Sequence, residues 1–274
     1  MIITVGNNKG GVGKTSVVCN LGVALARTGK RVLVIDADSQ RNATSILLGD
    51  DLRLEYTLYE LLDPESANGI NVKMCIYPSR HSNLFCLPNV EETSALDIPL
   101  GQTIPESLLL LRRKVREFAL RNFDITLIDN PPTIGLWLAL SLNVSDFVIV
   151  PVDAGSGQSL EGLRRVLELI TSIQKNTNPD LKFLRLLINR VDRRTSISKQ
   201  VVSLIQARFP DRVFDTFIPM NTRVQQAEFL NLTIFERDQS CMAARAYRAL
   251  AKELLTILST LGKEESSGKA TQAA

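Results

Sequence analysis

The stretch Asn8-Lys9-Gly10-Gly11-Val12-Gly13-Lys14-Thr15 decides how this chain folds. An apolar run, Ile2 to Val5, precedes it, and a stretch with helical spacing follows it from Ser16 to about Thr28. Glycines let successive backbone N–H groups turn toward an anion without a Cβ in the way. The N-terminus of the following helix adds partial positive charge. A strand, a glycine-rich loop and a helix in this order predict a phosphate-binding loop.

The rest of the chain continues the same alternation. A second apolar run, Val32 to Ile35, ends at Asp36 and completes a strand–helix–strand unit, which joins parallel strands by a right-handed crossover. Continuous apolar strands between amphipathic helices are typical of a parallel sheet covered on both faces. We therefore expect an α/β fold, a mostly parallel twisted sheet with helices on both faces, in one domain over residues 1–261. Further strands are predicted at Ile125–Ile128, Phe147–Val150 and Leu184–Ile188, and helices at about Ile104–Arg121, Leu160–Lys175 and Ser196–Arg208.

Composition excludes several other classes of protein. Hydrophobic residues make up 45% of the 274 residues, too many for a mainly disordered chain. No apolar run approaches the ~18 residues of a membrane-spanning helix, and the chain opens with no secretory signal. Four cysteines without a CxxC pair and a single histidine exclude a zinc finger, and we expect reduced thiols in a cytoplasmic protein. Residues 262–274 are polar and are expected to form a disordered tail.

The net charge of +3 is unevenly distributed along the chain. Residues 1–49 carry six Lys/Arg and two Asp/Glu, and residues 190–250 carry ten and six. Residues 50–100 carry three Lys/Arg and nine Asp/Glu. A basic block and an acidic block therefore stand in different parts of the chain, and each predicts a partner of opposite charge.

The residue types in the loop explain which ligand it suits. Lys14 can reach the β and γ phosphates of a nucleotide, and the Thr15 hydroxyl can ligate Mg²⁺. The strict pattern GxxxxGK[ST] has glycine where this chain has Asn8, and the rest of the pattern fits. The residues expected to bind the phosphates are Gly10, Gly11, Val12, Gly13, Lys14, Thr15 and Ser16.

Lys9 adds a second lysine five residues before Lys14, and with it the loop resembles the deviant Walker A box, KGGVGKT, of the ParA/MinD family of ATPases. Ser39 replaces the usual Pro of that family, Arg41 the usual Gly, and Met220 a frequent Arg. The match covers roughly residues 1–255, and its other segments occur in the family's order. They are 34–44 (VIDADSQRNAT), 127–132 (LIDNPP), 150–163, 189–195 (NRVDRRT), 218–223 (IPMNTR) and 246–248.

The resemblance implies the fold and the reaction. It implies a P-loop NTPase that hydrolyses ATP with Mg²⁺, with weak basal activity, as a homodimer that sandwiches two ATP molecules. In that dimer Lys9 would cross to the partner subunit and contact its nucleotide phosphates, where a second cation offsets crowded negative charge. Asp38 resembles the family residue that positions the attacking water.

Metal and adenine contacts are assigned to strand ends. Asp129 ends an apolar strand before two prolines and suits the role of holding Mg²⁺ through water, together with Thr15. Asp36 is expected to support the Mg²⁺ shell or the strand end. The resemblance places adenine between Asn189 and the segment Pro219-Met220-Asn221.

The output of such a switch is open to several alternatives. Arg193, Arg194 and Arg223 fall in the basic block and in or beside family segments that contact DNA, so we expect nonspecific binding to the DNA backbone and a nucleoid-associated protein. No helix-turn-helix segment precedes the loop, so operator binding is not expected. The function expected is that of a ParA-type partition ATPase, which segregates or positions a plasmid, a chromosome or a protein organelle.

Three other functions are alternatives to it. MinD-like membrane binding needs a C-terminal helix with bulky apolar residues, which residues 263–274 lack. Iron–sulfur chemistry needs bridging cysteines, and none lies between residues 87 and 240. A nucleotide-gated scaffold with little hydrolysis stays open. The acidic block at residues 50–100 suggests a docking side for a ParB-like or other adaptor with a basic segment that stimulates hydrolysis.

Overall fold

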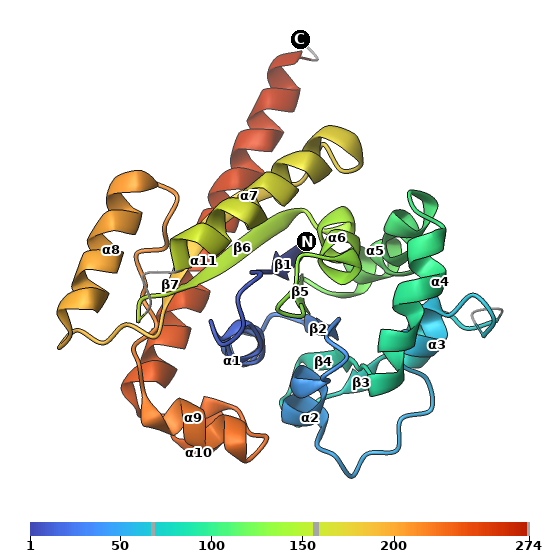
Figure 1. Cartoon of the computed structure of the whole chain (residues 1–274), viewed down its shortest axis with the longest axis horizontal. Coiled ribbons are helices and arrows are strands. Elements are labelled where there is room, and N and C mark those ends of the chain that lie inside the picture. The colour runs from blue at the N-terminus through green and yellow to red at the C-terminus, as the bar shows by residue number, and fades with distance from the viewer. Residues whose placement is uncertain (67–68, 156–158, 273–274) are drawn as a thin grey trace.

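The computed structural model describes residues 1–66, 69–155 and 159–272, and its centre is a seven-stranded sheet (Figure 1). The strand order is β3-β4-β2-β5-β1-β6-β7, and every pairing is parallel except that of β3 with β4. The predicted mostly parallel sheet is therefore confirmed. The strands are β1 (Ile2–Val5), β2 (Val32–Asp36), β3 (Tyr77–Pro78), β4 (Leu84–Leu87), β5 (Ile125–Asp129), β6 (Phe147–Asp153) and β7 (Lys182–Asn189).

Helices cover both faces of the sheet, as predicted. Neighbouring residues of one strand point to opposite faces, so Ile3 packs with one group of helices and Ile2 with the other. On the first face lie α1 (Lys14–Ala26), α2 (Asn42–Leu48), α10 (Ile234–Arg237) and α11 (Met242–Gln272). On the second lie α3 (Leu58–Leu62), α5 (Leu110–Asn122), α6 (Leu136–Val144), α7 (Ser159–Asn176) and α8 (Ser196–Arg208). The other helices are α4 (Asp97–Gln102), α9 (Thr222–Phe229) and the 3₁₀ helices η1 (Val72–Cys75), η2 (Glu91–Leu96) and η3 (Glu106–Leu109).

The strand order reverses direction at β1, which lies between β5 and β6. In open parallel sheets, ligands bind outside the carboxyl ends of the strands at such a reversal. The glycine-rich loop leaves the carboxyl end of β1 at this point. The register also pairs Asp36 with Asp129 at the same edge, so two predicted site carboxylates are neighbours across β2 and β5.

The two largest differences from the predicted element bounds are at α5 and β6. The stretch expected as one helix at Ile104–Arg121 divides into η3 and α5, which begins at Leu110. Pro105 explains why no helix begins at Ile104, because a proline disfavours helical backbone at the residue before it. Strand β6 continues through Pro151 to Asp153. A proline is tolerated here because β1 pairs with β6 only as far as Ile149. The missing N–H of Pro151 therefore interrupts no hydrogen bond between these two strands.

The disordered tail expected over residues 262–274 stays a prediction. Helix α11 continues without a break through Gly262 to Gln272, and Figure 1 shows its end extending beyond the rest of the molecule. Residues 263–272 include two Lys and two Glu and contain no proline, although Gly268 disfavours helix. The domain boundary at residue 261 stays a prediction.

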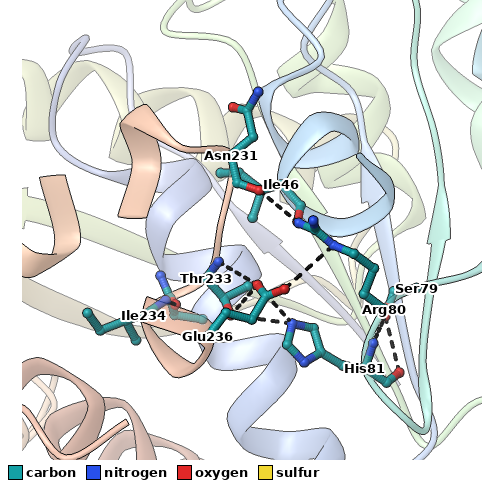
Figure 2. A network of polar contacts seen from close by, with 9 residues as sticks. Ile46, Ser79, Arg80, His81, Asn231, Thr233, Ile234 and Glu236 are labelled. Carbon is teal, nitrogen blue, oxygen red and sulfur yellow. Dashed lines mark hydrogen bonds and ion pairs between the residues drawn. The ribbon is translucent and has the colours of Figure 1, made fainter. Parts of the chain in front are cut away.

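A polar network, shown in Figure 2, joins the β3–β4 turn to α10. Glu236 caps α10 by accepting hydrogen bonds from the backbone N–H and hydroxyl of Thr233, at 2.8 and 2.9 Å. Its carboxylate also lies 3.4 Å from Nε2 of His81 and 3.6 Å from Nε of Arg80. Burial of this carboxyl acts against ionisation, but the bonds from His81 and Thr233 and the charge of Arg80 outweigh it and lower the pKa of Glu236 to about 2.

The low pKa of Glu236 predicts an acid-dependent contribution to stability. Because the folded-state pKa is below the usual 4.5, the contribution is present above that pH and is lost as the pH falls toward about 2. We expect Glu236→Gln to lower the free energy of unfolding by about 1–2 kcal/mol at pH 7, a value reduced for partial exposure, and to lower it less at pH 3.5. Urea unfolding at both pH values measures this. An equal loss at both would contradict an ionic origin, and Glu117→Gln, in an exposed pair with Arg121, is the matched control.

Candidate nucleotide-binding site

A cavity of about 430 Å³ opens at the carboxyl edge of the sheet, beside the glycine-rich loop. Six parts of the chain contribute to it: the loop and the start of α1, the segment after β2, Pro132 after β5, the end of β7, the segment from Ile218 through α9, and Tyr247 of α11. The predicted site residues that line it are Gly10, Gly11, Gly13, Lys14, Thr15, Ser16, Asp38, Asn189, Pro219, Met220 and Asn221. The fold therefore brings together residues that lie more than 200 positions apart in the sequence.

The glycine-rich loop has the backbone conformation that its sequence requires. Gly11 and Gly13 have φ angles of 72° and 82°, in the left-handed region that favours glycine. A Cβ on Gly13 would also lie 2.4 Å from Nδ2 of Asn189, so a larger residue has no room there. The backbone of Asn8 is not in the left-handed region. This explains how asparagine can replace the glycine of the strict pattern.

Two residues at the end of β7 brace this loop. Asn189, which is buried, donates from Nδ2 to the carbonyl of Val12 at 2.7 Å, and Arg190 donates from Nη1 to the carbonyl of Gly11 at 2.8 Å. Asn189 thus lies at the cavity, as expected, but its amide nitrogen is bonded to the loop. Its role toward adenine stays a prediction. Arg190 was not singled out from the sequence, where nothing distinguishes it from the other arginines of the basic block.

Lys14 lies at the base of the cavity among carboxylates. Its side chain is buried, and Nζ donates to the carbonyl of Lys9 at 3.1 Å. Burial lowers the pKa of Lys14, whereas the charges of Asp129 and Asp38 raise it. An ammonium held in this way has an anionic phosphate as its natural additional partner.

Asp129 is fully buried, and neither of its carboxylate oxygens has a hydrogen-bond partner in the part of the chain that the structure describes. Burial raises the pKa of Asp129 well above its usual range, Asp36 adds to the rise, and the Thr15 hydroxyl and Lys14 oppose it. Orphaned buried carboxylate oxygens next to a hydroxyl fit a hard divalent cation, which prefers oxygen ligands. Among the described residues no group of three His, Cys, Asp or Glu side chains could hold a metal by itself, so the remaining ligands would be water and phosphate.

Asp36 and Asp38 have different surroundings. Asp36 is fully buried; its Oδ2 accepts from the N–H and the hydroxyl of Thr44, both at 2.8 Å, and its Oδ1 accepts from the N–H of Asp38. Burial raises the pKa of Asp36 to about 6, although these bonds lower it. The geometry therefore favours the expected strand-end support over a direct contact with Mg²⁺. Asp38 lines the cavity, and its Oδ1 accepts from the N–H of Gln40 at 3.0 Å.

Arg41 stands where the resembling family has glycine, and its φ of 48° shows why glycine suits this position. Its guanidinium donates to Oγ of Ser45 at 3.3 Å and to Oδ1 of Asp50 at 3.1 Å. These contacts help to hold a side chain that the left-handed backbone disfavours. The loop that carries Asp38 is therefore compatible with arginine in place of glycine at residue 41.

The expected adenine side of the cavity is formed by the segment before α9. Met220 is about half exposed, and Asn221 accepts from the N–H of Arg223 at 2.8 Å and so caps α9. Glu228 and Tyr247 line the cavity as well, and neither was expected as a site residue. The hydroxyl of Tyr247 lies 3.4 Å from that of Ser16, a contact across 231 positions that local sequence patterns do not reveal.

The three candidate DNA-binding arginines are not all in one place. Arg193 and Arg194 line a hollow of about 740 Å³ that shares Met220 with the nucleotide cavity, and Arg245 joins them there. Arg194 makes two bonds to Asp192, at 2.9 and 2.8 Å, which lower the pKa of that carboxyl to about 2. Arg223 lies outside this hollow, 3.2 Å from Oε1 of Gln226 and 3.9 Å from Asp238.

Several acids of the block at residues 50–100 have structural partners. Asp50 accepts from Arg41 and Ser45, and Glu60 accepts from the N–H and hydroxyl of Thr57 and caps α3. Asp97 accepts from Nε1 of Trp137 at 2.6 Å. An adaptor-binding surface in this block would therefore have to use its other acids.

Comparison with known proteins finds similar sequences along most of the chain. A family model described as an AAA domain matches residues 1–183. The sporulation initiation inhibitor protein Soj of Bacillus subtilis is 36% identical over 253 residues, which cover 92% of this chain and 97% of Soj. The chromosome partitioning protein ParA of Caulobacter vibrioides is 34% identical over 257 residues, which cover 93% of this chain and 94% of ParA.

A solved structure shows the same fold around a nucleotide. Cobyrinic acid a,c-diamide synthase of Mycobacterium smegmatis, with bound ADP and magnesium, is 28% identical, has a TM-score of 0.77 and covers 93% of each chain. None of the helices described in this chain combines the length and apolar content that crossing a bilayer requires.

Proposed function

This chain belongs to the ParA/MinD family of ATPases, and we propose that it works as a partition ATPase, an ATP-dependent switch that segregates or positions a cargo. The observation that carries the proposal is a buried cation, Lys14, which lines the cavity and interacts electrostatically with the buried, orphaned carboxylate of Asp129. Such a pair suits the phosphates of ATP and their Mg²⁺.

The reaction is in-line attack of water on the γ-phosphate. Thr15 and Asp129 would hold Mg²⁺, which neutralises charge on the phosphate oxygens when it is bound. Lys14 contacts the β and γ phosphates, and Asp38 positions the water. The loop N–H groups and the start of α1 stabilise negative charge without reorganising, because the loop is already bonded to β7 through Asn189.

A homodimer explains the placement of Lys9. Among the described residues, Lys9 is not one of those that line its own subunit's cavity, although Gly10 and Gly11 beside it do. We propose that two copies meet face to face over two ATP molecules and that Lys9 contacts the nucleotide of the partner subunit. This arrangement would make ATP binding and dimerisation one event.

DNA is the proposed surface on which the switch works. The hollow with Arg193, Arg194 and Arg245 adjoins the nucleotide cavity, and dimerisation would double it. Binding would be to the phosphate backbone, with little sequence preference and a steep dependence on salt. The protein would then lie in the cytoplasm on the nucleoid, and an adaptor with a basic segment would stimulate hydrolysis and connect it to the cargo.

Phosphate release measured with Mg²⁺ and ATP, alone and with DNA and an adaptor candidate, tests the proposed function. We expect slow release by the protein alone and faster release with DNA and adaptor together. A protein that binds ATP but hydrolyses none of it under any of these conditions would instead be a nucleotide-gated scaffold.

The basic hollow gives a prediction for DNA binding. We expect Arg193→Glu combined with Arg245→Glu to weaken binding of the ATP-bound protein to random-sequence DNA about tenfold or more, because phosphate contacts are lost and charge is reversed. Fluorescence anisotropy at several salt concentrations measures this, and the double variant should also show a shallower salt dependence. Arg121→Glu combined with Arg164→Glu is the control, since it changes the net charge by the same amount and both arginines are exposed in ion pairs on helices of the other face of the sheet. Equal loss in the control and the double variant would show that net charge alone governs binding.

A further inference from the structure

We propose that Arg80 and Asp50 are positioning residues for nucleotide binding, because their polar contacts hold α9 in place as one side of the nucleotide cavity. This proposal rests on the proposed function, which places ATP in that cavity. The name "α9 clamp" is used below for Asp50, Arg80, Asn231 and Glu236.

Helix α9 has little apolar attachment to the rest of the protein. Of its eight residues, all of which the structure describes, only Ala227 is buried, and Phe229 is 89% exposed. Yet Val224, Gln225 and Glu228 of this helix line the cavity. Val224 packs against the core as a partly buried side chain, but a helix with so little buried surface gains little from the hydrophobic effect, so polar contacts at its ends help to set its position.

The α9 clamp fixes the C-terminal end of this helix. The carbonyl of Asn231, two residues after α9, accepts from Nη2 of Arg80 at 2.8 Å. The side chain of Asn231 donates from Nδ2 to Oδ2 of Asp50 at 2.9 Å. Asn231 has a φ of 51°, a left-handed conformation that asparagine tolerates better than most residues and that these contacts help to maintain.

The other end of the α9 clamp lies on α2. Arg80 also donates from Nη2 to the carbonyl of Ile46 at 2.5 Å, and Asp50 accepts from Ser45 at 2.7 Å (Figure 2 shows the Arg80 contacts). Helix α2 begins with Asn42, which lines the cavity on the side of Asp38. The contacts of Arg80 and Asp50 therefore set the separation between two sides of the cavity.

Glu236 is the member of the α9 clamp that lies in α10. Its carboxylate lies 3.6 Å from Nε of Arg80 and so helps to hold the guanidinium toward Asn231 and Ile46 (Figure 2). The N–H of Ile234, at the start of α10, donates to Oδ1 of Asn20 in α1 at 2.8 Å. Helix α10 is thereby attached to the helix that follows the phosphate loop, so α9 is positioned relative to the phosphates as well.

Two variants test this. Arg80→Met and Asp50→Asn should each raise the Kd for a fluorescent ATP analogue about three- to tenfold, since α9 would no longer be held at the cavity. At saturating ATP the hydrolysis rate of Arg80→Met, which has no contact with the Asp38 loop, should stay within about twofold of wild type, so its KM rises while its kcat does not. Hydrogen exchange of the amides at 222–231 should become faster in both variants. Arg80→Lys, which keeps a cation but not the fork of donors, should fall between Arg80→Met and wild type.

The controls separate the α9 clamp from folding and from the proposed function. Arg53→Met, in the same acidic segment but outside the α9 clamp, should bind the analogue as wild type does. Asp50→Asn keeps the shape of a half-exposed side chain and should fold even if Arg80→Met does not. Wild-type affinity in Asp50→Asn and Arg80→Met, or a fall in kcat at unchanged KM, would overturn the role of the α9 clamp. Failure of the wild-type protein to bind the analogue would instead overturn the proposed function.

Discussion

Asp38→Ala should lower the rate of ATP hydrolysis about 100-fold or more while ATP binding stays close to wild type. Asp38 is 7% exposed and lines the cavity, so its carboxylate faces the site and not bulk solvent. A carboxylate that orients or deprotonates the attacking water acts mainly in the transition state, and removing it lowers kcat more than affinity.

The alanine variant should keep its loop. The N–H of Arg41 donates to the carbonyl of Asp38 at 2.9 Å, and the N–H of Asp38 donates to Asp36. Both contacts use the backbone of residue 38 and survive the substitution. The contact that is lost is the one from the N–H of Gln40 to Oδ1.

Single-turnover hydrolysis and analogue binding, measured on the same preparation, check this prediction. Asp51→Ala, a nearby exposed acid, is the matched control and should hydrolyse ATP at the wild-type rate. A parallel loss of binding and hydrolysis in Asp38→Ala would mean that Asp38 shapes the loop and does not act on water.

Elements with strong local signals could be predicted from the sequence. Helix Ser196–Arg208 has the bounds predicted for it, because Thr195 caps it by accepting from the N–H of Ser198, and an apolar face follows. Strand Ile2–Val5 is likewise as predicted, since four apolar or β-branched residues precede the glycine-rich loop. The candidate phosphate-loop residues could be found for the same reason, because their spacing is fixed by one loop.

Contacts between distant residues could not be predicted in this way. The hydrogen bond between Arg80 and Asn231 spans 151 positions, and the one between Asn189 and Val12 spans 177. No local sequence pattern distinguishes Arg80 or Asn189 from an ordinary turn residue. Strand β4 was missed because Leu84–Leu87 is short and its place beside β2 depends on sheet order, not on local pattern. Arg194 was expected to meet DNA, yet its partner Asp192, two residues away, emerges only from side-chain geometry.

Lys9→Ala is the second substitution with a large expected effect, about 100-fold or more on hydrolysis, because a cation that compensates phosphate charge in the transition state is removed. The backbone around Lys9 should be unchanged. The N–H of Lys9 donates to Oδ1 of Asn7 at 3.1 Å, and the carbonyl of Lys9 accepts from Nζ of Lys14. Neither contact uses the side chain of Lys9. Lys30→Ala, on the surface in a pair with Asp124, is the matched control.

Mixing variants decides whether Lys9 acts in its own subunit or in the partner. An equal mixture of Lys9→Ala and Asp38→Ala proteins forms mixed dimers, in which the Lys9→Ala subunit has an intact Asp38 and receives Lys9 from its partner. If Lys9 acts across the interface, the mixture should recover about a quarter of the wild-type rate, because half of the dimers are mixed and each has one complete site. If Lys9 acts within its own subunit, no site is complete and no activity returns.

A second mixture measures a loss of activity where the first measures a gain. It also shows whether the subunits exchange. Wild type mixed equally with a chain carrying both Lys9→Ala and Asp38→Ala should retain about a quarter of the activity if Lys9 acts on the partner, because only wild-type dimers then have complete sites. It should retain about half if Lys9 acts within its own subunit. Recovery in the first mixture together with suppression in the second therefore requires a dimer in which each Lys9 contacts the other subunit's nucleotide.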